Sequence, residues 1–265
     1  MKIGLIGPQG FLGHSILQEC HRRNFKTFEI TSNSDVELAV KSGVELVINA
    51  NGNSKKYLAD RNPLLDFEKN VNSTLEYLHS ISNHGINYIH LSSGEVYGEG
   101  LKLNAREDSV INPDRLTNYG LSKYIAELVV RKYAPSWKIF RIGGLVGPFL
   151  AKGPIFDLMS KRECYFSDES MFQILSTQTT AKMILEISEK VPENAIFNLT
   201  SPDRISISEV KSLLNISKVN APELLTFESN MDTSKCTEIV SLPSSKDELL
   251  TFLQSPWSSK LSART

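Results

Sequence analysis

The hydrophobic pattern of the chain alternates between short apolar runs and longer segments with helical periodicity. Between the runs, apolar residues recur at helical spacing, as at Val71, Leu75, Leu78 and Ile81. Alternating strands and helices are typical of a parallel sheet that helices cover on both faces. The pattern therefore predicts an α/β fold with a doubly wound parallel sheet. Strands are expected at 2–6, in a run that ends near Ile30, and at 44–49, 88–92, 138–142 and 195–199.

The organisation of the chain changes near residue 150, where two glycine–proline pairs mark a loop. Beyond it, two serines that are each followed by a glutamate three residues later predict short helices beginning near Ser206 and Ser245. We therefore expect a sheet-forming domain at 1–148, with a strand contributed from about 190–200, and a smaller lobe at 149–265.

A glycine-rich turn directly follows the first apolar run and precedes a helical segment that ends near Arg23. In such a place, Gly7 permits a tight turn, Gly10 lets a pyrophosphate approach the backbone, and Gly13 lets the helix pack closely on the strand. The free amides and the dipole at the start of the helix favour phosphate. The turn therefore predicts a dinucleotide site. Its contacts are expected from Gly7, Gln9, Gly10, Phe11, Leu12 and Gly13.

The residues after the second predicted strand bear on the type of dinucleotide. Enzymes that prefer NAD usually place an acidic residue there for the ribose hydroxyls, whereas this chain has Thr31, Ser32 and Asn33. Small hydroxyl donors suit a 2′-phosphate better than a carboxylate would. We therefore expect Thr31 and Ser32 to contact the cofactor and NADP(H) to be slightly preferred over NAD(H). Glu29 keeps NAD(H) open if the strand ends earlier.

Tyr119 and Lys123 form a candidate acid/base pair. Residues four positions apart on a helix point from the same face, so the ammonium can lie close to the phenol. A nearby cation favours phenolate and lowers the pKa of a phenol from its usual value of about 10. Such a pair also occurs on ordinary exposed helices. Together with the glycine turn, it indicates carbonyl chemistry.

These motifs resemble those of the extended short-chain dehydrogenase/reductases, in particular the NAD(P)-dependent epimerase/dehydratase group that acts on nucleotide sugars. Leu91–Gly98 is similar to the segment with the catalytic serine of the family, and Asn70–Thr74 and Arg141–Pro148 resemble two further family segments. The resemblance implies a Rossmann-like fold with a smaller C-terminal substrate lobe, and a homodimer. It also implies cofactor contacts at Asn49, Ala50, Asn51, Tyr119 and Lys123.

The resemblance implies a role for each residue of the site. Tyr119 exchanges the hydroxyl proton, Lys123 lowers the pKa of Tyr119 and binds the nicotinamide ribose, and Ser93 hydrogen-bonds the reacting oxygen. Glu95 stands where dehydratases of the family have a catalytic glutamate, and it also fits an exposed loop residue. Gly94 precedes it where a dehydratase has an acid, which disfavours dehydration.

Some family features are missing from the chain. Gly144 replaces an asparagine that contacts the substrate diphosphate in many relatives, and Thr179 replaces an aspartate. The segment between Thr31 and Val44 is so short that the usual third strand is expected to be reduced or absent. A helical stripe of Ile125, Leu128 and Val129 indicates core or subunit contact.

The expected reaction is reduction of a 4-keto sugar or epimerisation through a keto intermediate, on a nucleotide-sugar substrate. The alternative is a dinucleotide sensor or scaffold of the same fold that has no catalytic activity. We favour the enzyme because the serine, tyrosine and lysine are all present.

Composition narrows the classes of partner. The net charge is −1 and the basic residues are dispersed, which argues against nucleic acid and membrane surfaces as partners. The three cysteines are far apart and have no paired histidines, so neither a metal site nor a disulfide framework is expected. No secretory signal pattern or long apolar run is visible, so a cytoplasmic location is expected.

Overall fold

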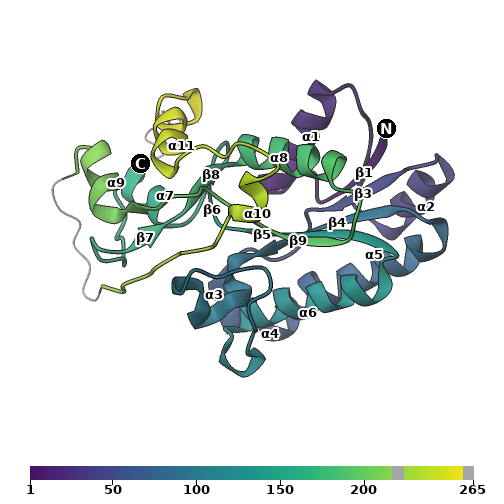
Figure 1. Cartoon of the computed structure of the whole chain (residues 1–265), viewed down its shortest axis with the longest axis horizontal. Helices are drawn as coiled ribbons and strands as arrows, with labels where there is room; N and C mark the ends of the chain where they lie inside the picture. The colour runs from purple at the N-terminus through teal and green to yellow at the C-terminus, as the bar shows by residue number, and fades with distance from the viewer. Residues whose placement is uncertain (217–223, 259–265) are drawn as a thin grey trace.

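Six parallel strands form the central sheet in the order β2-β1-β3-β4-β5-β9 (Figure 1). The computed structural model describes residues 1–216 and 224–258. The strands of the sheet are β1 (Lys2–Ile6), β2 (Lys26–Ile30), β3 (Leu46–Asn49), β4 (Asn87–Ser93), β5 (Ser136–Ile142) and β9 (Ala195–Leu199). The predicted parallel α/β fold is therefore confirmed. The largest boundary errors are two residues: β3 begins two residues later than its apolar run, and β5 begins two residues earlier.

Helices cover both faces of this sheet, as the alternating pattern predicted. On one face, α1 (Phe11–Arg22) and α8 (Thr177–Lys190) pack on alternate strand residues such as Leu5, Ile89 and Phe197. On the other face lie α2 (Asn33–Lys41), α5 (Ser73–Ile81) and α6 (Asn118–Tyr133), over residues such as Val47, Tyr88 and Ile139. Successive strand residues therefore bury their side chains in two separate cores.

The short segment at 31–44 contains one helix and no strand. The chain passes from β2 through α2 directly to β3, which pairs with β1 on the side opposite β2. In the described part of the chain no strand pairs with the outer edge of β2. The expected reduction of this region is therefore confirmed, because nine helical residues replace a further strand.

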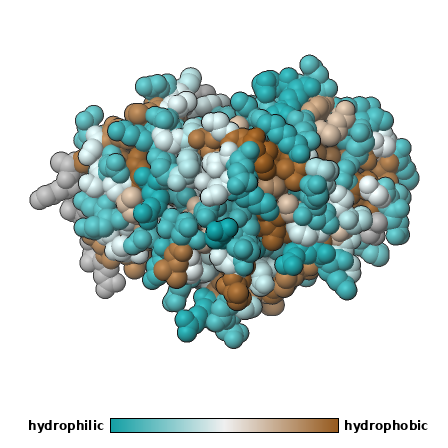
Figure 2. All heavy atoms as spheres, viewed as in Figure 1, coloured by the Kyte–Doolittle hydropathy of each residue, from teal (hydrophilic) through white to brown (hydrophobic). Residues whose placement is uncertain are grey.

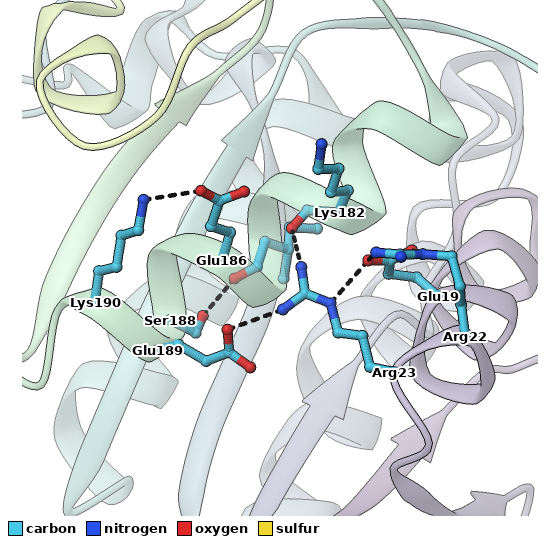
Figure 3. A network of polar contacts seen from close by, with 9 residues as sticks. Glu19, Arg22, Arg23, Lys182, Glu186, Ser188, Glu189 and Lys190 are labelled. Carbon is cyan, nitrogen blue, oxygen red and sulfur yellow. Dashed lines mark hydrogen bonds and ion pairs between the residues drawn. The ribbon is translucent and has the colours of Figure 1, made fainter.

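A polar network joins α1 to α8 on their outer side (Figure 3). Arg23, just after α1, contacts Glu19 at 2.8 Å and Glu189 of α8 at 2.9 Å. Closer to the sheet, the buried Ser15 hydroxyl donates to Thr177 at the start of α8. The surface ion pairs contribute little individually. The buried bond and the shared core hold α1, and with it the glycine turn, against α8.

The face of α6 that packs on the sheet carries polar residues. Ser122, Lys123 and Glu127 are buried there, whereas Leu128 is 41% exposed. The stripe of Ile125, Leu128 and Val129 is therefore not the main core face of this helix. A contact with another subunit stays a prediction for Leu128.

A smaller lobe lies beyond the carboxyl ends of the strands, on the left in Figure 1. Its core is formed by apolar residues such as Val146, Leu158, Ile207 and Leu249. Its elements are β6 (Gly144–Val146), α7 (Pro154–Met159), β7 (Met171–Phe172), β8 (Ile174–Ser176), β10 (Ile205–Ser206), α9 (Ile207–Leu213) and α11 (Ser245–Leu253). A short helix, α10 (Ser234–Thr237), packs against β9.

The two predicted helix starts in the lobe have different outcomes. Ser206 and Glu209 form the expected capping box at the start of α9. At α11 the cap is Ser244 with Asp247, one residue earlier than predicted. The predicted pair was wrong there because Ser245 instead bonds Asp203 and the backbone of Ile174.

The surface is mostly polar on the face shown in Figure 2, with hydrophobic residues scattered among hydrophilic ones. Among the described residues, no helix is long and apolar enough to cross a membrane.

Candidate active site

The predicted site residues meet at the carboxyl edge of the sheet, around the point where the strand order reverses. β1 lies between β2 and β3, and in such sheets ligands bind outside the carboxyl ends of the strands at this reversal. Gly7 follows β1, Asn49 ends β3, and Ser93 ends β4. The fold therefore brings three separate sequence motifs to one edge.

The glycine turn depends on the absence of side chains at two positions. Gly7 has a φ of +74°, and a Cβ there would lie 2.9 Å from the backbone nitrogen of Asn51. A Cβ at Gly13 would lie 2.0 Å from the carbonyl oxygen of Gly7. The backbone nitrogen of Gly10 donates to the same oxygen at 3.1 Å. The turn and α1 are therefore packed directly against β1 and the loop after β3.

The start of α1 is suited to an anion. Gly10 is its N-cap, no side chain caps the helix, and its first turn has no acidic residue. The first amides of a helix have no partner within it and lie at the positive end of the dipole. Gln9 is exposed, while Phe11 and Leu12 are half-buried and pack on the lobe core and the sheet core respectively. The backbone here fits a dinucleotide pyrophosphate.

The loop after β3 faces the glycine turn. Ala50 and Asn51 are half-buried beside Gly7 and Gly10. The side chain of Asn49 is fully buried and donates to Thr74 at 3.2 Å and to the hydroxyl of Tyr88 at 2.8 Å. Its oxygen accepts from the backbone of Asn51. The side chain of Asn49 therefore holds the loop in shape through bonds within the protein. Ala50 and Asn51 are the residues of this loop that can contact a ligand.

The residues after β2 surround a carboxylate, whereas the sequence led us to expect none at this place. Asp35, in the first turn of α2, accepts hydrogen bonds of 2.9 Å from the backbone nitrogen and the hydroxyl of Thr31 and from the backbone nitrogen of Ser32. The bonds from Thr31 and Ser32 hold the pKa of Asp35 below its usual value. An ionised carboxylate therefore lies between the two predicted contacts. The spacing of Ser32 and Asp35, which is that of a capping box, was the missed signal.

Tyr119 and Ser93 are in contact. Thr117 caps α6 by accepting from the backbone of Gly120 at 3.1 Å, which begins the helix beside the end of β4. At Gly120 a Cβ would lie 2.6 Å from the carbonyl oxygen of Glu95, so only glycine allows this close approach. The side chain of Ser93 lies beside the buried phenol of Tyr119 and lowers its pKa.

Lys123 lies one helical turn after Tyr119 and is also buried. Its Nζ donates to the carbonyl oxygen of Leu91 in β4 at 2.7 Å. Burial lowers the pKa of Lys123 to about 8, against the opposing charges of Glu127 and Asp66.

The pKa of Tyr119 differs from the sequence-based expectation. Burial raises the pKa of the phenol above its usual value, and the charges of Glu95 and Asp66 raise it further, while the Ser93 hydrogen bond lowers it. The expected lowering by Lys123 is wrong for this structure, because the ammonium donates to the Leu91 carbonyl and desolvation dominates. Tyr119 is a protonated phenol at neutral pH.

A buried carboxylate next to this pair was not predicted. Asp66 lies in α4 (Pro63–Phe67) and has no exposed surface. Its oxygens accept from Asn53 at 2.6 Å, Asn70 at 2.9 Å and Ser122 at 2.5 Å. Asn70 belongs to a π-helical turn, η1 (Glu68–Asn72). The resemblance of Asn70–Thr74 to a family segment was the available signal for one partner, whereas nothing in the sequence marked Asp66.

Glu95 lies two residues after Ser93 and is partly exposed. It belongs to η3 (Gly94–Lys102), and its carboxylate pairs with Nζ of Lys56 in α3 (Lys56–Arg61) at 2.5 Å. That ammonium also lies 5.4 Å from the ring centroid of Phe227. At Gly94 a Cβ would lie 2.6 Å from the sulfur of Met231. Glu95 is thus ion-paired, and the preceding position has no room for an acid unless Met231 moves.

Two further buried groups stabilise the strands beneath the site. Arg141 of β5 pairs with Glu127 of α6 at 2.8 Å and donates to the hydroxyl of Tyr97 at 2.9 Å. Ser92 donates to Glu127 at 2.5 Å. The side chains of Arg141 and Glu127 therefore link β5, α6 and η3 in the interior.

Gly144 has no space for a side chain. A Cβ at this position would lie 2.8 Å from the carbonyl oxygen of Gln173, so the backbone excludes the asparagine found in many relatives.

Metal ligands do not gather in the described residues, where no group of three or more His, Cys, Asp or Glu side chains could hold an ion. Cys20, Cys164 and Cys236 are free and buried.

The sequence matches the NAD dependent epimerase/dehydratase family over residues 6–160. This region is more than half of the chain and includes the glycine turn, Ser93, Tyr119 and Lys123. The chain therefore belongs to the NAD dependent epimerase/dehydratase family. No curated protein matches it in sequence.

Solved structures with the same fold include enzymes of several kinds. A dTDP-4-dehydrorhamnose reductase from Bacillus anthracis, in complex with NADP, has a TM-score of 0.79 and 16% identity over 95% of this chain and 97% of that chain. A UDP-glucose 4-epimerase from Thermotoga maritima, with UDP-glucose, has a TM-score of 0.76 and 17% identity over 99% and 96%. An NAD-dependent NDP-hexosamine 5,6-dehydratase has a TM-score of 0.81 and 18% identity over 98% of each chain. The chain shares the fold of these proteins along almost its whole length.

Proposed function

We propose that the chain is a nicotinamide-dependent enzyme that acts on a nucleotide-activated sugar, by reducing a 4-keto sugar or by epimerisation through a keto intermediate. The observation that carries this proposal is the position of Ser93 beside the buried Tyr119, with Lys123 one turn further on α6. The glycine turn lies at the same edge of the sheet. A reductase and an epimerase with similar folds, whose substrates are nucleotide sugars by name, support the choice of substrate class.

The cofactor is a nicotinamide dinucleotide, which supplies or accepts the hydride. The start of α1 has no capping side chain and no acid in its first turn, so it fits the pyrophosphate. Lys123 and the loop at Ala50 and Asn51 would hold the nicotinamide end. At the adenosine end, the sequence favoured NADP(H) because of Thr31 and Ser32. The Asp35 carboxylate that these residues hold supports NAD(H) instead, since it would repel a 2′-phosphate.

The protonation state of the site supports reduction as the first candidate reaction. Because burial raises the pKa of Tyr119, the phenol keeps its proton at neutral pH and can donate it to the oxygen of a ketone as hydride reaches the carbon. The Ser93 hydroxyl hydrogen-bonds that oxygen, and the Lys123 ammonium binds the nicotinamide ribose. Oxidation of a hydroxyl, the first step of an epimerase, needs the phenolate, which burial opposes.

Dehydration is the least supported reaction. It needs an acid and a base beside the ketone carbon, and the candidate base, Glu95, is ion-paired with Lys56 at 2.5 Å. The position before it is Gly94. We therefore assign Glu95 the role of holding Lys56 in an ion pair beside Ser93.

A homodimer through α5 and α6 is part of the proposal and comes from the family resemblance. The two helices pack side by side, and Leu75 and Leu128 expose 39% and 41% of their surface on them. Apolar side chains exposed on adjacent helices favour contact with a second copy.

The function is tested by binding and turnover assays on the purified chain. Tryptophan fluorescence quenching with NADH and NADPH measures cofactor binding, and a panel of nucleotide sugars and nucleotide 4-keto sugars is then screened at the nicotinamide absorbance band. Consumption of reduced cofactor with a keto sugar identifies a reductase. Interconversion of epimers with tightly bound cofactor and no net consumption identifies an epimerase. Binding without turnover across the panel contradicts the proposal and identifies a sensor or scaffold.

A further inference from the structure

Two opposite charges are buried beside each other at the nicotinamide end, and each is held by uncharged groups. Asp66 has no exposed surface, and its hydrogen-bond donors are the amides of Asn53 and Asn70 and the hydroxyl of Ser122. Lys123 is 5% exposed and donates to the Leu91 carbonyl. A buried charge is costly unless an opposite charge compensates it. Each of these groups therefore needs a counter-charge.

The geometry connects the two charges through short links. Ser122, which donates to Asp66, is the residue directly before Lys123. On the other side, a Cβ at Gly52 would lie 2.5 Å from Oδ1 of Asn70 and 3.9 Å from Nζ of Lys123. Asn70 donates to Asp66 with its other amide atom at 2.9 Å. The Asp66 carboxylate and the Lys123 ammonium are thus linked through Asn70, Ser122 and the Gly52 backbone.

The other charged groups around Lys123 have partners of their own or are neutral. Glu127, also on α6, forms an ion pair with Arg141 of β5 at 2.8 Å. Glu95 of η3 pairs with Lys56 at 2.5 Å. On β4, burial and the Lys123 charge lower the pKa of His90 well below its usual value, so its ring is neutral at neutral pH.

We propose that Asp66 is the counter-charge of Lys123, a positioning residue that holds the ammonium and α6 against the loop at Gly52. The proposal deepens the function proposed above and rests on it for the role of Lys123. Asp66 acts through Lys123 and does not touch the substrate.

Two opposing effects set the pKa of Lys123. Burial alone lowers the pKa of Lys123, and the charges of Glu127 and Asp66 raise it again, so that it stays at about 8. Lys123 is then mainly protonated at neutral pH. The charge of Glu127 raises the pKa of Lys123 more than that of Asp66 does, but Glu127 is also paired with Arg141. Removing Asp66 takes away the second of these contributions and should shift the balance toward neutral Lys123.

The direct test follows the titration of Lys123 by NMR in protein labelled with ¹³C at the lysine Cε, with Lys123→Met to assign the signal. The wild-type midpoint is expected near pH 8. In Asp66→Asn it is expected to fall by about one pH unit. Ser122→Ala is the matched control, because it removes a hydrogen bond to Asp66 and leaves the charge; its midpoint should stay within about 0.3 unit of wild type. No shift in Asp66→Asn, or an equal shift in Ser122→Ala, would overturn the proposal.

A double variant keeps the proposal testable even if Asp66→Asn folds poorly. Asp66→Asn leaves the buried ammonium without its counter-charge, whereas Asp66→Asn/Lys123→Met removes both charges together. The double variant should therefore unfold at a higher urea concentration than Asp66→Asn. An equal or lower unfolding midpoint in the double variant would show that the charges are not coupled and would overturn the proposal.

Activity separates this proposal from the function on which it rests. If the site is a reductase, the alkaline limb of kcat/KM follows the loss of the Lys123 proton, and Asp66→Asn should move it to lower pH by the same shift that NMR records. An NMR shift in a protein with no turnover on any nucleotide sugar would refute the proposed function and leave the pairing intact. Turnover with an unmoved limb and an unmoved NMR midpoint would refute the pairing and leave the function intact.

Discussion

The two ends of the candidate cofactor site are built in different ways. At the nicotinamide end, Tyr119 and Lys123 are buried on α6, and burial shifts both of their pKa values. At the adenosine end, Thr31, Ser32 and Asp35 bond one another in a short loop where both hydroxyl residues are exposed. Charges at the buried end are screened weakly by water and salt, and those at the exposed end strongly. Substitutions should therefore have large effects at the first end and modest, salt-dependent effects at the second.

The largest effect is expected from Tyr119→Phe at the buried end. The variant loses the proton donor and keeps the ring, so kcat/KM should fall by roughly 10³-fold. The dissociation constant for the reduced cofactor should change by less than about threefold, because the phenol donates to the substrate oxygen. Steady-state kinetics with the keto sugar found in the screen and fluorescence titration measure the two quantities.

Tyr124→Phe is the matched control for this change. Tyr124 lies on the same helix next to Lys123 and packs against the cluster around Val96 and Tyr97. Its variant should keep activity within about twofold of wild type. Near-normal turnover in Tyr119→Phe, or equal losses in both variants, would remove Tyr119 from the chemistry.

An intermediate effect is expected from Asp35→Asn at the exposed end. Removing the carboxylate removes the repulsion of a 2′-phosphate, so the ratio of kcat/KM with NADPH to that with NADH should rise roughly tenfold at low salt and less at high salt. Glu37→Gln, on the same helix and exposed, should leave the ratio unchanged. If the wild-type enzyme already prefers NADPH and Asp35→Asn leaves the ratio unchanged, Asp35 does not set the cofactor preference. The sequence-based expectation of NADP(H) would then hold.

The smallest effect is expected from Glu95→Gln. Because Lys56 holds the carboxylate in an ion pair that is partly exposed to water, kcat/KM for ketone reduction should stay within about threefold of wild type. Lys56→Gln should behave similarly. A hundredfold or greater loss in Glu95→Gln alone, together with release of water from the sugar, would make Glu95 a catalytic base and the enzyme a dehydratase.

Much of the fold could be predicted because it is encoded in local patterns. The strands β1 and β9 match their apolar runs residue for residue, and the replacement of a strand by α2 follows from the shortness of the 31–44 segment. Where the prediction failed, long-range contacts decided. Ser245 has the right spacing for a cap, but it bonds Asp203 from a distant turn, and Ser244 caps α11 instead.

The site shows the same division between local and long-range features. The glycine turn and the Ser93, Tyr119 and Lys123 motifs were visible because each has a fixed local spacing, and the sheet brings them to one edge. Asp66 was not visible, because its importance comes from burial against residues of other elements. The pKa of Tyr119 was predicted with the wrong sign, because desolvation depends on the packed structure and not on the neighbouring lysine alone.

The most direct measurement of the central claim follows the hydride itself. The enzyme is incubated with NADH carrying deuterium at the transferable position and with the panel of nucleotide 4-keto sugars, and the product is analysed by mass spectrometry and NMR. The account predicts one deuterium on the former carbonyl carbon with the wild-type chain, and labelling that is roughly 10³-fold slower with Tyr119→Phe. Cofactor binding with no label in any sugar, or the same label in Tyr119→Phe, would contradict it.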